Sequence, residues 1–265
     1  MMNFIPNNLR AQRRAVCTFC RCDDRKTENL RTPPEAGGRH FLIAFGGMRS
    51  YVAREVMRIS WKPNKINADW ESLFNSYRRF VKPGHTVLEI GASVTDRTRE
   101  ISRHCARVIG VELMPERKPE DYGNIHYVVG DWEKLTAVLE PESVDVAISS
   151  HVIEHVPDDL KALNELYRVL KPGGAAFINT PNRRRLTRRV IELFTGERKF
   201  PFWEHQREYI EEDLRRLLAT SAFKRYKIIP LVFGVHGGRV YCYLEKVPRP
   251  LRGMANYWEI HLFKD

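Results

Sequence analysis

The sequence predicts a doubly wound α/β fold, in which a mostly parallel seven-stranded sheet carries helices on both faces. Three observations predict it. From residue 86 onward, short apolar runs alternate with helical patterns. The breaker Lys82-Pro83-Gly84 precedes the first run, and Gly91 follows it where the strand must turn toward a helix. The 265 residues, 43% of them hydrophobic, suffice for one large domain with extensions.

The composition limits the compartment and the partners. Lys and Arg exceed Asp and Glu by 11, which favours contact with phosphate, acidic lipid or nucleic acid. No apolar run reaches the roughly 20 residues that span a bilayer, and the basic start lacks the apolar core of a signal peptide. We therefore expect a cytoplasmic protein whose five cysteines are reduced.

Residues 1–45 are expected to form an irregular arm, because they combine many Arg residues with Asn-Asn, Pro-Pro and Gly-Gly pairs. The arm contains Cys17-x-x-Cys20-x-Cys22, a spacing that three metal ligands can have. A tetrahedral site needs a fourth ligand, and only His40 is near. We therefore assign no metal site.

The main domain is expected to cover residues 46–265 and to open with two helices within 46–81. The first is expected around Tyr51 to Ile59. The second has apolar side chains at three- and four-residue spacing, which favours packing on the core over a role as a lid. These side chains are Trp70, Leu73, Phe74, Tyr77 and Phe80.

Three predicted strands end in groups that suit a nucleoside ligand. The run from Thr86 to Ile90 ends at Gly91, where a ligand can approach the backbone and the helix expected from Thr95 to His104 offers free N–H groups. The strand from Arg107 ends in Glu112, 21 residues after Gly91, the place of a ribose-binding acid in doubly wound folds.

A third strand starts at Ile125 and ends in Asp131-Trp132, which can meet an exocyclic amine and a base. Because the carboxyl ends of parallel strands meet at one edge, Gly91, Glu112 and Asp131 should converge there. The alternative is an ordinary turn followed by solvated charges.

A fourth strand, Val144 to Ser150, leads into His151-Val-Ile-Glu154-His155-Val-Pro157 and so places two histidines at the same edge. A helix is expected after Asp158, up to Leu170, and a fifth strand over 175–180.

Residues 181–208 interrupt this alternation and predict a cap insertion. The insertion contains an Arg run over 183–189, which is either a solvated helix face or an anion-binding patch, and an aromatic cluster over 200–203. Beyond it we expect a helix over 211–220 and strands over 226–233 and 257–263. A long irregular connection is expected over 234–256.

Five pieces in order resemble the class I S-adenosylmethionine-dependent methyltransferases, chiefly between Lys82 and Thr180, and in particular the bacterial type that tailors small molecules, glycans or lipids. They are Val-Leu-Glu89-Ile-Gly91, Gly-Val-Glu112, Gly-Asp131-Trp132, Ser150-His-Val-Ile-Glu154-His155-Val-Pro and Leu-Lys-Pro-Gly-Gly. The resemblance implies a Rossmann-like fold with an antiparallel last strand, and S-adenosylmethionine as the cofactor.

The resemblance also implies a role for each matching residue. Glu89 and Gly91 would face the methionine part, Glu112 the ribose, and Ser150 the sulfur. Leu113 would pack on adenine and Asp131 would meet its amino group. The implied cofactor-binding residues are Glu89, Gly91, Ala92, Ser93, Glu112, Leu113, Asp131, Trp132 and Ser150.

The glycine turn departs from the family pattern, because Ser93 and Thr95 stand where the family usually has glycine. Ser93 is small enough to fit and can donate a hydrogen bond. Thr95 adds bulk beside the cofactor, or alternatively caps the next helix.

The resemblance predicts O-methylation of a small molecule, glycan or lipid, with an anionic acceptor and peripheral membrane contact both compatible with the charge. Methyl transfer is an in-line displacement, and a histidine at the edge suits removal of the acceptor proton. His155 is the first candidate, with His151 or His205 behind it, although a purely structural His155 remains an alternative.

Trp203, His205 and Arg207 are expected to bind the substrate. The rival functions are nucleic-acid methylation, which the charge favours, and a non-catalytic binding protein with the same fold. Against the first, the fourth strand ends in Ser149-Ser150-His151 and lacks the Asn-Pro-Pro-aromatic or Asp-Pro-Pro-aromatic signature of amino-methylating nucleic-acid enzymes.

Overall fold

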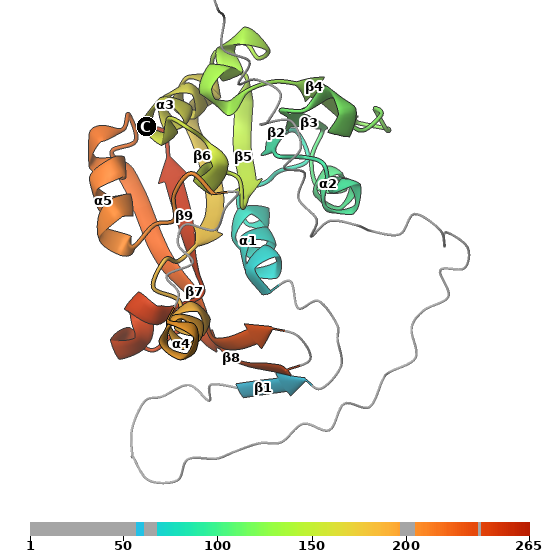
Figure 1. Cartoon of the computed structure of the whole chain (residues 1–265). Coiled ribbons are helices and arrows are strands. Elements are labelled where there is room, and N and C mark those ends of the chain that lie inside the picture. Colours follow the sequence, from blue (N-terminus) through green and yellow to red (C-terminus); the bar gives the residue numbers. More distant parts are fainter. Residues whose placement is uncertain (1–56, 61–67, 197–204, 238–239) are drawn as a thin grey trace, which may run out of the picture.

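A computed structural model describes residues 57–60, 68–196, 205–237 and 240–265. In this part of the chain, nine strands form one sheet in the order β1-β8-β7-β9-β6-β5-β2-β3-β4 (Figure 1). The seven strands from β7 to β4 are the predicted sheet, and only β9 runs antiparallel to its neighbours within it. The predicted fold class is therefore confirmed.

The elements follow the predicted order closely. The strands are β1 (Met57–Ser60), β2 (Thr86–Ile90), β3 (Arg107–Glu112), β4 (Ile125–Val129), β5 (Val144–Ser150), β6 (Leu170–Pro181), β7 (Arg225–Gly237), β8 (Val240–Lys246) and β9 (Tyr257–Phe263). The α-helices are α1 (Ala68–Arg78), α2 (Thr95–Ser102), α3 (Asp159–Val169), α4 (Leu186–Thr195) and α5 (Glu211–Thr220). Short 3-10 helices are η3 (Pro115–Arg117), η4 (Trp132–Ala137), η5 (Ile153–His155) and η6 (Arg249–Met254).

Two hydrophobic cores cover the opposite faces of the sheet, because successive strand residues point to opposite sides. Val87 of β2 belongs to the core that contains Leu73 and Tyr77 of α1. Its neighbour Leu88 belongs to the larger core, together with apolar residues of α3 and α5 such as Leu163. The predicted second helix thus packs on the sheet through Leu73 and Tyr77, both fully buried.

The start of α3 shows how the local sequence fixes an element. Asp158 is the N-cap residue, and its Oδ1 accepts a hydrogen bond from the backbone N–H of Lys161 at 2.9 Å. The buried residues Ala162, Leu163 and Leu166 then form the apolar stripe of the helix. The helix start therefore holds the preceding turn, which carries the candidate site, against the larger core.

Two predictions about the far end of the sheet were wrong. Residues 57–59 were expected to be helical, but they lie in β1, which pairs antiparallel with β8 from Met57 with Leu244 to Ser60 with Tyr241. The connection over 234–256 was expected to be irregular, but it contains the end of β7, all of β8, and η6. Pairing with a partner strand far along the chain overrides the local pattern in both places.

Several expected features lie outside the described residues, namely the arm over 1–45 with Cys17, Cys20 and Cys22, and Trp203 of the aromatic cluster. Among the helices that the structure describes, none is long and apolar enough to cross a membrane.

Gly110→Ala tests how tightly β3 packs beneath the candidate site. A Cβ at Gly110 would lie 2.5 Å and 2.7 Å from two ring carbons of Tyr127 and 2.9 Å from the Cβ of Ala92. We expect a loss of about 1–3 kcal/mol in the free energy of unfolding, measured with urea. Gly84→Ala is the matched control, since nothing lies within 4 Å of its added Cβ. Equal stabilities of the two variants would contradict the packing described.

Candidate active site

The carboxyl ends of four neighbouring parallel strands bring the predicted residues to one edge of the sheet. Ile90 pairs with Val111 on one side and with Ser149 on the other, so Gly91, Glu112 and Ser150 follow at adjacent strand ends. Glu112 in turn pairs with Val129 of β4, shortly before Asp131. The convergence expected from the sequence is therefore present in the structure.

Gly91 has a backbone conformation that requires glycine. Its φ is +79°, its N–H donates to Val111 O at 2.9 Å, and an added Cβ would lie 2.5 Å from Cγ2 of Val152. The turn after β2 is thus tied to the end of β3 and packed under the segment that follows β5.

Glu89 is a buried carboxyl group just before this turn. Only 5% of the residue is exposed, and its Oε2 has no hydrogen-bond partner among the residues that the structure describes. Burial raises the pKa of Glu89 to about 7, although a hydrogen bond from Thr98 and the charge of Arg97 act in the opposite direction. Glu89 forms no ion pair with a described residue, and a buried acid of this kind is suited to a ligand that carries a positive charge.

The two departures from the glycine pattern have different surroundings. Ser93 Oγ accepts a hydrogen bond from Nη2 of Arg117 at 3.0 Å, and this bond connects the turn after β2 with η3 after β3. Thr95 is the first residue of α2, and the N-cap position belongs to Val94, which makes no side-chain capping bond. The alternative that Thr95 caps this helix was therefore wrong.

The residues predicted to face a nucleoside lie after β3 and β4. Glu112 is buried and its Oε1 accepts from the backbone N–H of Met114 at 3.2 Å, while Leu113 is 64% exposed. Asp131 caps η4 by accepting from Glu133 N at 2.9 Å. Trp132 is only 3% exposed and belongs to the larger core, so its unpartnered Nε1, rather than its ring face, is the group left for a ligand.

The end of β5 contains further buried polar groups. The hydroxyl oxygens of Ser149 and Ser150 are buried, and no described residue forms a hydrogen bond with either of them. Asn179, on the neighbouring strand β6, is fully buried, and both its backbone oxygen and its Oδ1 accept from the backbone N–H of His151 at 3.1 Å.

His151 stands in a strained conformation directly after these serines. Its φ of +55° lies in the left-handed region, which is uncommon for non-glycine residues and which Glu142 and Val232 also adopt. Its Nδ1 is 3.4 Å from Oε1 of Glu154, and its ring meets that of Tyr257 edge to face, with the centroids 5.2 Å apart.

Glu154 is the buried acid of this group. The side chain is fully buried, and its Oε2 accepts from the hydroxyl of Thr180 on β6 at 3.0 Å. Burial alone would raise the pKa of Glu154, but its interactions with His151 and His155 outweigh this effect and hold the pKa below its ordinary value. The sequence motif contained Glu154, but we assigned it no role.

His155 and His205 lie ring to ring, with their centroids 4.8 Å apart and their planes nearly perpendicular. Nδ1 of His205 is 3.0 Å from Oε1 of Glu208. Burial alone would raise the pKa of Glu208, but His205 and the charges of Arg185 and Arg188 lower it to about 2. Two arginines of the predicted run are thus used inside the protein, with Nη1 of each donating to Glu208 Oε2 at 2.8 Å and 2.7 Å.

Arg207 forms structural contacts in this structure. Its Nη1 is 2.8 Å from Oδ2 of Asp159, at the start of α3, and its Nη2 donates to Pro157 O. A cavity of about 400 Å³ lies beside these groups, lined among others by Arg183, Tyr209 and Arg216. Three residues were expected to bind the substrate. His205 lies against His155, and Arg207 attaches its segment to Asp159. Trp203 lies outside the described residues.

Glu208 and Asn179 were missed by sequence reasoning. Nothing in the local pattern marks either residue as buried. The available signal for Glu208 was its position three residues after His205, a spacing at which two side chains can meet.

Comparison with known proteins agrees with this geometry. A family model described as "Methyltransferase domain" matches residues 88–178. A "Ubiquinone biosynthesis O-methyltransferase" of Xanthomonas campestris is 32% identical over 40% of the chain and 46% of its own length. A "Probable S-adenosylmethionine-dependent methyltransferase" of Mycolicibacterium smegmatis is 30% identical over 59% of the chain and 62% of its own length. The chain thus spans about half the length of the curated relatives that it matches.

A solved S-adenosylmethionine-dependent methyltransferase from Thermotoga maritima has the same fold, with a TM-score of 0.52 and 22% identity over 75% of this chain and 90% of that one. The order of the strands, the glycine turn at Gly91 and the matched residues 88–178 agree with one another. Residues 88–178 therefore match the methyltransferase domain family, and the described fold is that of solved S-adenosylmethionine-dependent methyltransferases.

Proposed function

We propose that this protein transfers a methyl group from S-adenosylmethionine to a hydroxyl oxygen of a small molecule, glycan or lipid. The observation that carries the proposal is the set of buried, unpartnered polar atoms at the strand edge, next to a group of histidines. The Xanthomonas relative, named as an O-methyltransferase, supports oxygen as the acceptor atom.

The residues at the edge fit the cofactor that the family uses. Glu89 Oε2 is a buried acceptor without a partner and suits the ammonium of the methionine part. Gly91 keeps the backbone open to a ligand, and Glu112 suits the ribose hydroxyls. The exposed Leu113 offers an apolar surface for adenine. S-adenosylmethionine supplies a methyl group on a positively charged sulfur.

His151 is our first candidate for the group that receives the acceptor proton. It directly follows Ser150, and a buried carboxylate lies 3.4 Å from its Nδ1, where the negative charge favours the protonated imidazole. The strained backbone supports this choice, because such strain is concentrated at functional positions. His155, which the sequence favoured, meets His205 instead.

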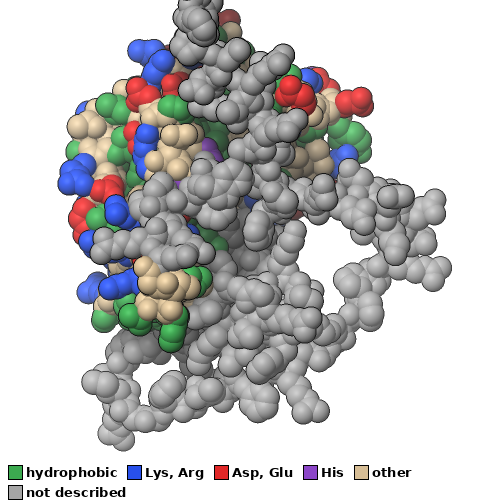
Figure 2. All heavy atoms as spheres, viewed as in Figure 1, with side chains coloured by type: hydrophobic (Ala, Val, Ile, Leu, Met, Phe, Trp, Pro, Cys, Tyr) green, Lys and Arg blue, Asp and Glu red, His purple; other side chains and the backbone are tan. Residues whose placement is uncertain are grey.

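Nucleic-acid methylation is the weaker alternative. Arg185 and Arg188 of the basic run are paired with buried Glu208 and are therefore not available to a phosphate backbone. Figure 2 shows acidic and basic side chains interspersed over the described part of the visible face, without a continuous basic stripe.

Labelling separates these functions. The protein is incubated with methyl-labelled S-adenosylmethionine and with separate lipid, glycan, small-molecule and RNA fractions of a bacterial extract. We expect label in a methyl ether of one of the first three fractions, and cofactor binding by calorimetry. Label confined to RNA would establish the alternative, and a folded protein that binds neither the cofactor nor its demethylated product would refute methyl transfer.

Glu89→Gln tests the buried acid through stability. Because the pKa of Glu89 in the folded chain, about 7, lies above its ordinary 4.5, its contribution to stability falls as the pH rises from 4.5 to 7. The difference corresponds to about 3 kcal/mol. We expect wild type to lose up to this amount relative to Glu89→Gln between pH 5 and pH 8, measured by urea unfolding. Glu140→Gln, at an exposed position, should follow wild type. Parallel pH profiles for wild type and Glu89→Gln would contradict the description of Glu89.

His151→Asn tests the proton acceptor while sparing the backbone, because asparagine tolerates the left-handed conformation better than most residues. We expect kcat on the labelled fraction to fall at least 100-fold, with little change in the cofactor Kd. His126→Asn is the control, since His126 also faces a carboxylate, that of Asp121 at 3.3 Å, on an exposed part of the molecule. An unchanged kcat for His151→Asn would eliminate this role.

A further inference from the structure

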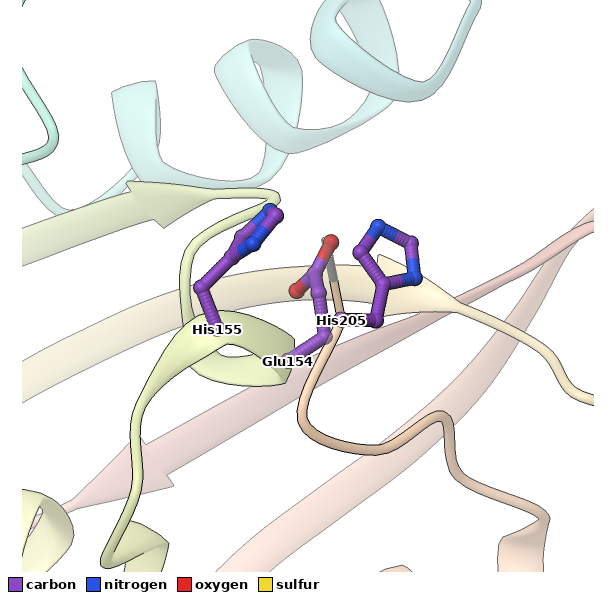
Figure 3. A group of neighbouring side chains, drawn as sticks. All are labelled: Glu154, His155 and His205. Carbon is purple, nitrogen blue, oxygen red and sulfur yellow. The ribbon is translucent and has the colours of Figure 1, made fainter. Parts of the chain in front are cut away.

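Glu154, His155 and His205 form a group with the composition of a metal site. Glu154 and His155 belong to η5, whereas His205 follows 50 positions later, at the end of the cap insertion. One ligand atom from each residue lies within 4.8 Å of the other two. Figure 3 shows the three side chains close together, and the two imidazole rings meet with their centroids 4.8 Å apart.

The backbone holds the two segments of this group together. The N–H of Gln206 donates to Glu154 O at 2.8 Å, and the N–H of Arg207 donates to the same oxygen at 3.2 Å. The residue after His205 is therefore bonded directly to the residue before His155. The approach of the three side chains follows from main-chain contacts, which do not depend on how the side-chain rotamers are set.

His205 and Glu154 are each held by a neighbouring polar side chain, as metal ligands in proteins commonly are. Nδ1 of His205 faces Glu208 Oε1 at 3.0 Å, so a proton held there leaves the lone pair on Nε2, as in carboxylate–histidine–metal arrangements. Glu208 is itself fixed by Arg185 and Arg188. Thr180 holds one carboxylate oxygen of Glu154, while the other, Oε1, is buried without a hydrogen-bond partner of normal geometry.

The charge balance points the same way. A carboxylate that is fully removed from water needs a compensating positive charge. Glu208 has two arginines for this purpose, but the described neighbours of the Glu154 side chain are histidines and a threonine. A cation between Glu154 and its histidines would add a full positive charge to the compensation that the histidines provide.

We propose that Glu154, His155 and His205 bind one divalent metal ion of the kind that imidazole favours, such as Zn²⁺, rather than Mg²⁺ or Ca²⁺. Three protein ligands leave a coordination position open, as in catalytic zinc sites. Ligand atoms around zinc stand roughly 3.4 Å apart, so atoms that now lie within 4.8 Å of one another would approach by up to about 1.4 Å on binding, which rotation about the side-chain bonds allows.

The ion would lie near His151, whose Nδ1 is 3.4 Å from Glu154 Oε1, and this place gives it a role in the proposed methyl transfer. A cation there would favour ionisation of an acceptor hydroxyl placed next to it. The O–H bond breaks with its proton passing to His151, the new O–C bond forms, and the sulfur keeps the electron pair of the broken C–S bond. This role rests on the proposed function, whereas binding of the ion does not.

Metal binding is measured on full-length, tag-free protein that has first been treated with a chelator, and in the absence of cofactor and acceptor. Zn²⁺ is titrated in competition with a chromophoric chelator, and Co²⁺ is added separately as a spectroscopic probe. We expect one ion per chain and, with Co²⁺, visible absorption typical of nitrogen and oxygen ligands. Both His205→Ala and His155→Ala should weaken the affinity at least 100-fold, and circular dichroism should confirm that they are folded.

Two control variants make the result specific. Cys17, Cys20 and Cys22 are potential ligands, so the triple Cys→Ser variant should retain the site, and His126→Ala should do so as well. Glu154→Gln, which retains a hydrogen-bond acceptor for Thr180, should weaken binding without unfolding the chain. Equal affinities of wild type and His205→Ala, or loss of binding in the triple Cys variant, would overturn the proposal. Metal binding without cofactor binding would instead refute the proposed function and leave the metal site standing.

Discussion

The buried carboxylate of Glu154 is the interaction on which the candidate site depends. Its side chain accepts from Thr180 on β6 and faces His151 at the end of β5. Its backbone oxygen accepts from the N–H groups of Gln206 and Arg207. One residue thus joins the ends of two central strands to the segment that closes the cap insertion. Without the Glu154 side chain the strands would still pair, but the contact that positions His151 would be absent.

Three buried glutamates at this edge show how the surroundings decide the state of an acid. Glu89 has no strong cation partner, and its pKa rises to about 7. Glu208 contacts His205 and two arginines, and its pKa falls to about 2. The charged groups that act on Glu154 are the histidines His151 and His155, and its pKa is lowered. Burial is common to all three, so the neighbouring charges explain the difference.

The part of the fold that could be predicted from the sequence is the part that short-range patterns determine. The five parallel strands from β2 to β6 are short apolar runs flanked by turn residues, and their order fixes where their ends meet. The pairing of β1 with β8 could not be predicted, because it joins residues about 180 positions apart. The residues of a short segment do not indicate which distant strand it will pair with.

The same limit applies to the site. Gly91 and Glu112 could be located because their spacing follows from the fold. The pairing of His151 with Glu154 was within reach, since the two residues lie three positions apart. The contact between His155 and His205 was not, because it depends on how the cap insertion returns to the sheet. The sequence therefore favoured His155 as the base, because it gave no sign of the contact between His155 and His205.

The return of the insertion is fixed by contacts that lie behind the histidines. Arg207 bonds to Asp159, and Tyr209 donates from its hydroxyl to the same carboxylate at 2.9 Å. Trp258 Nε1 of β9 donates to Tyr209 O at 3.2 Å. These bonds attach residues 207–209 to α3 and to the antiparallel strand, so that His205 is placed by the core of the domain. The position of the imidazole is therefore set by contacts of residues 207–209 with α3 and β9.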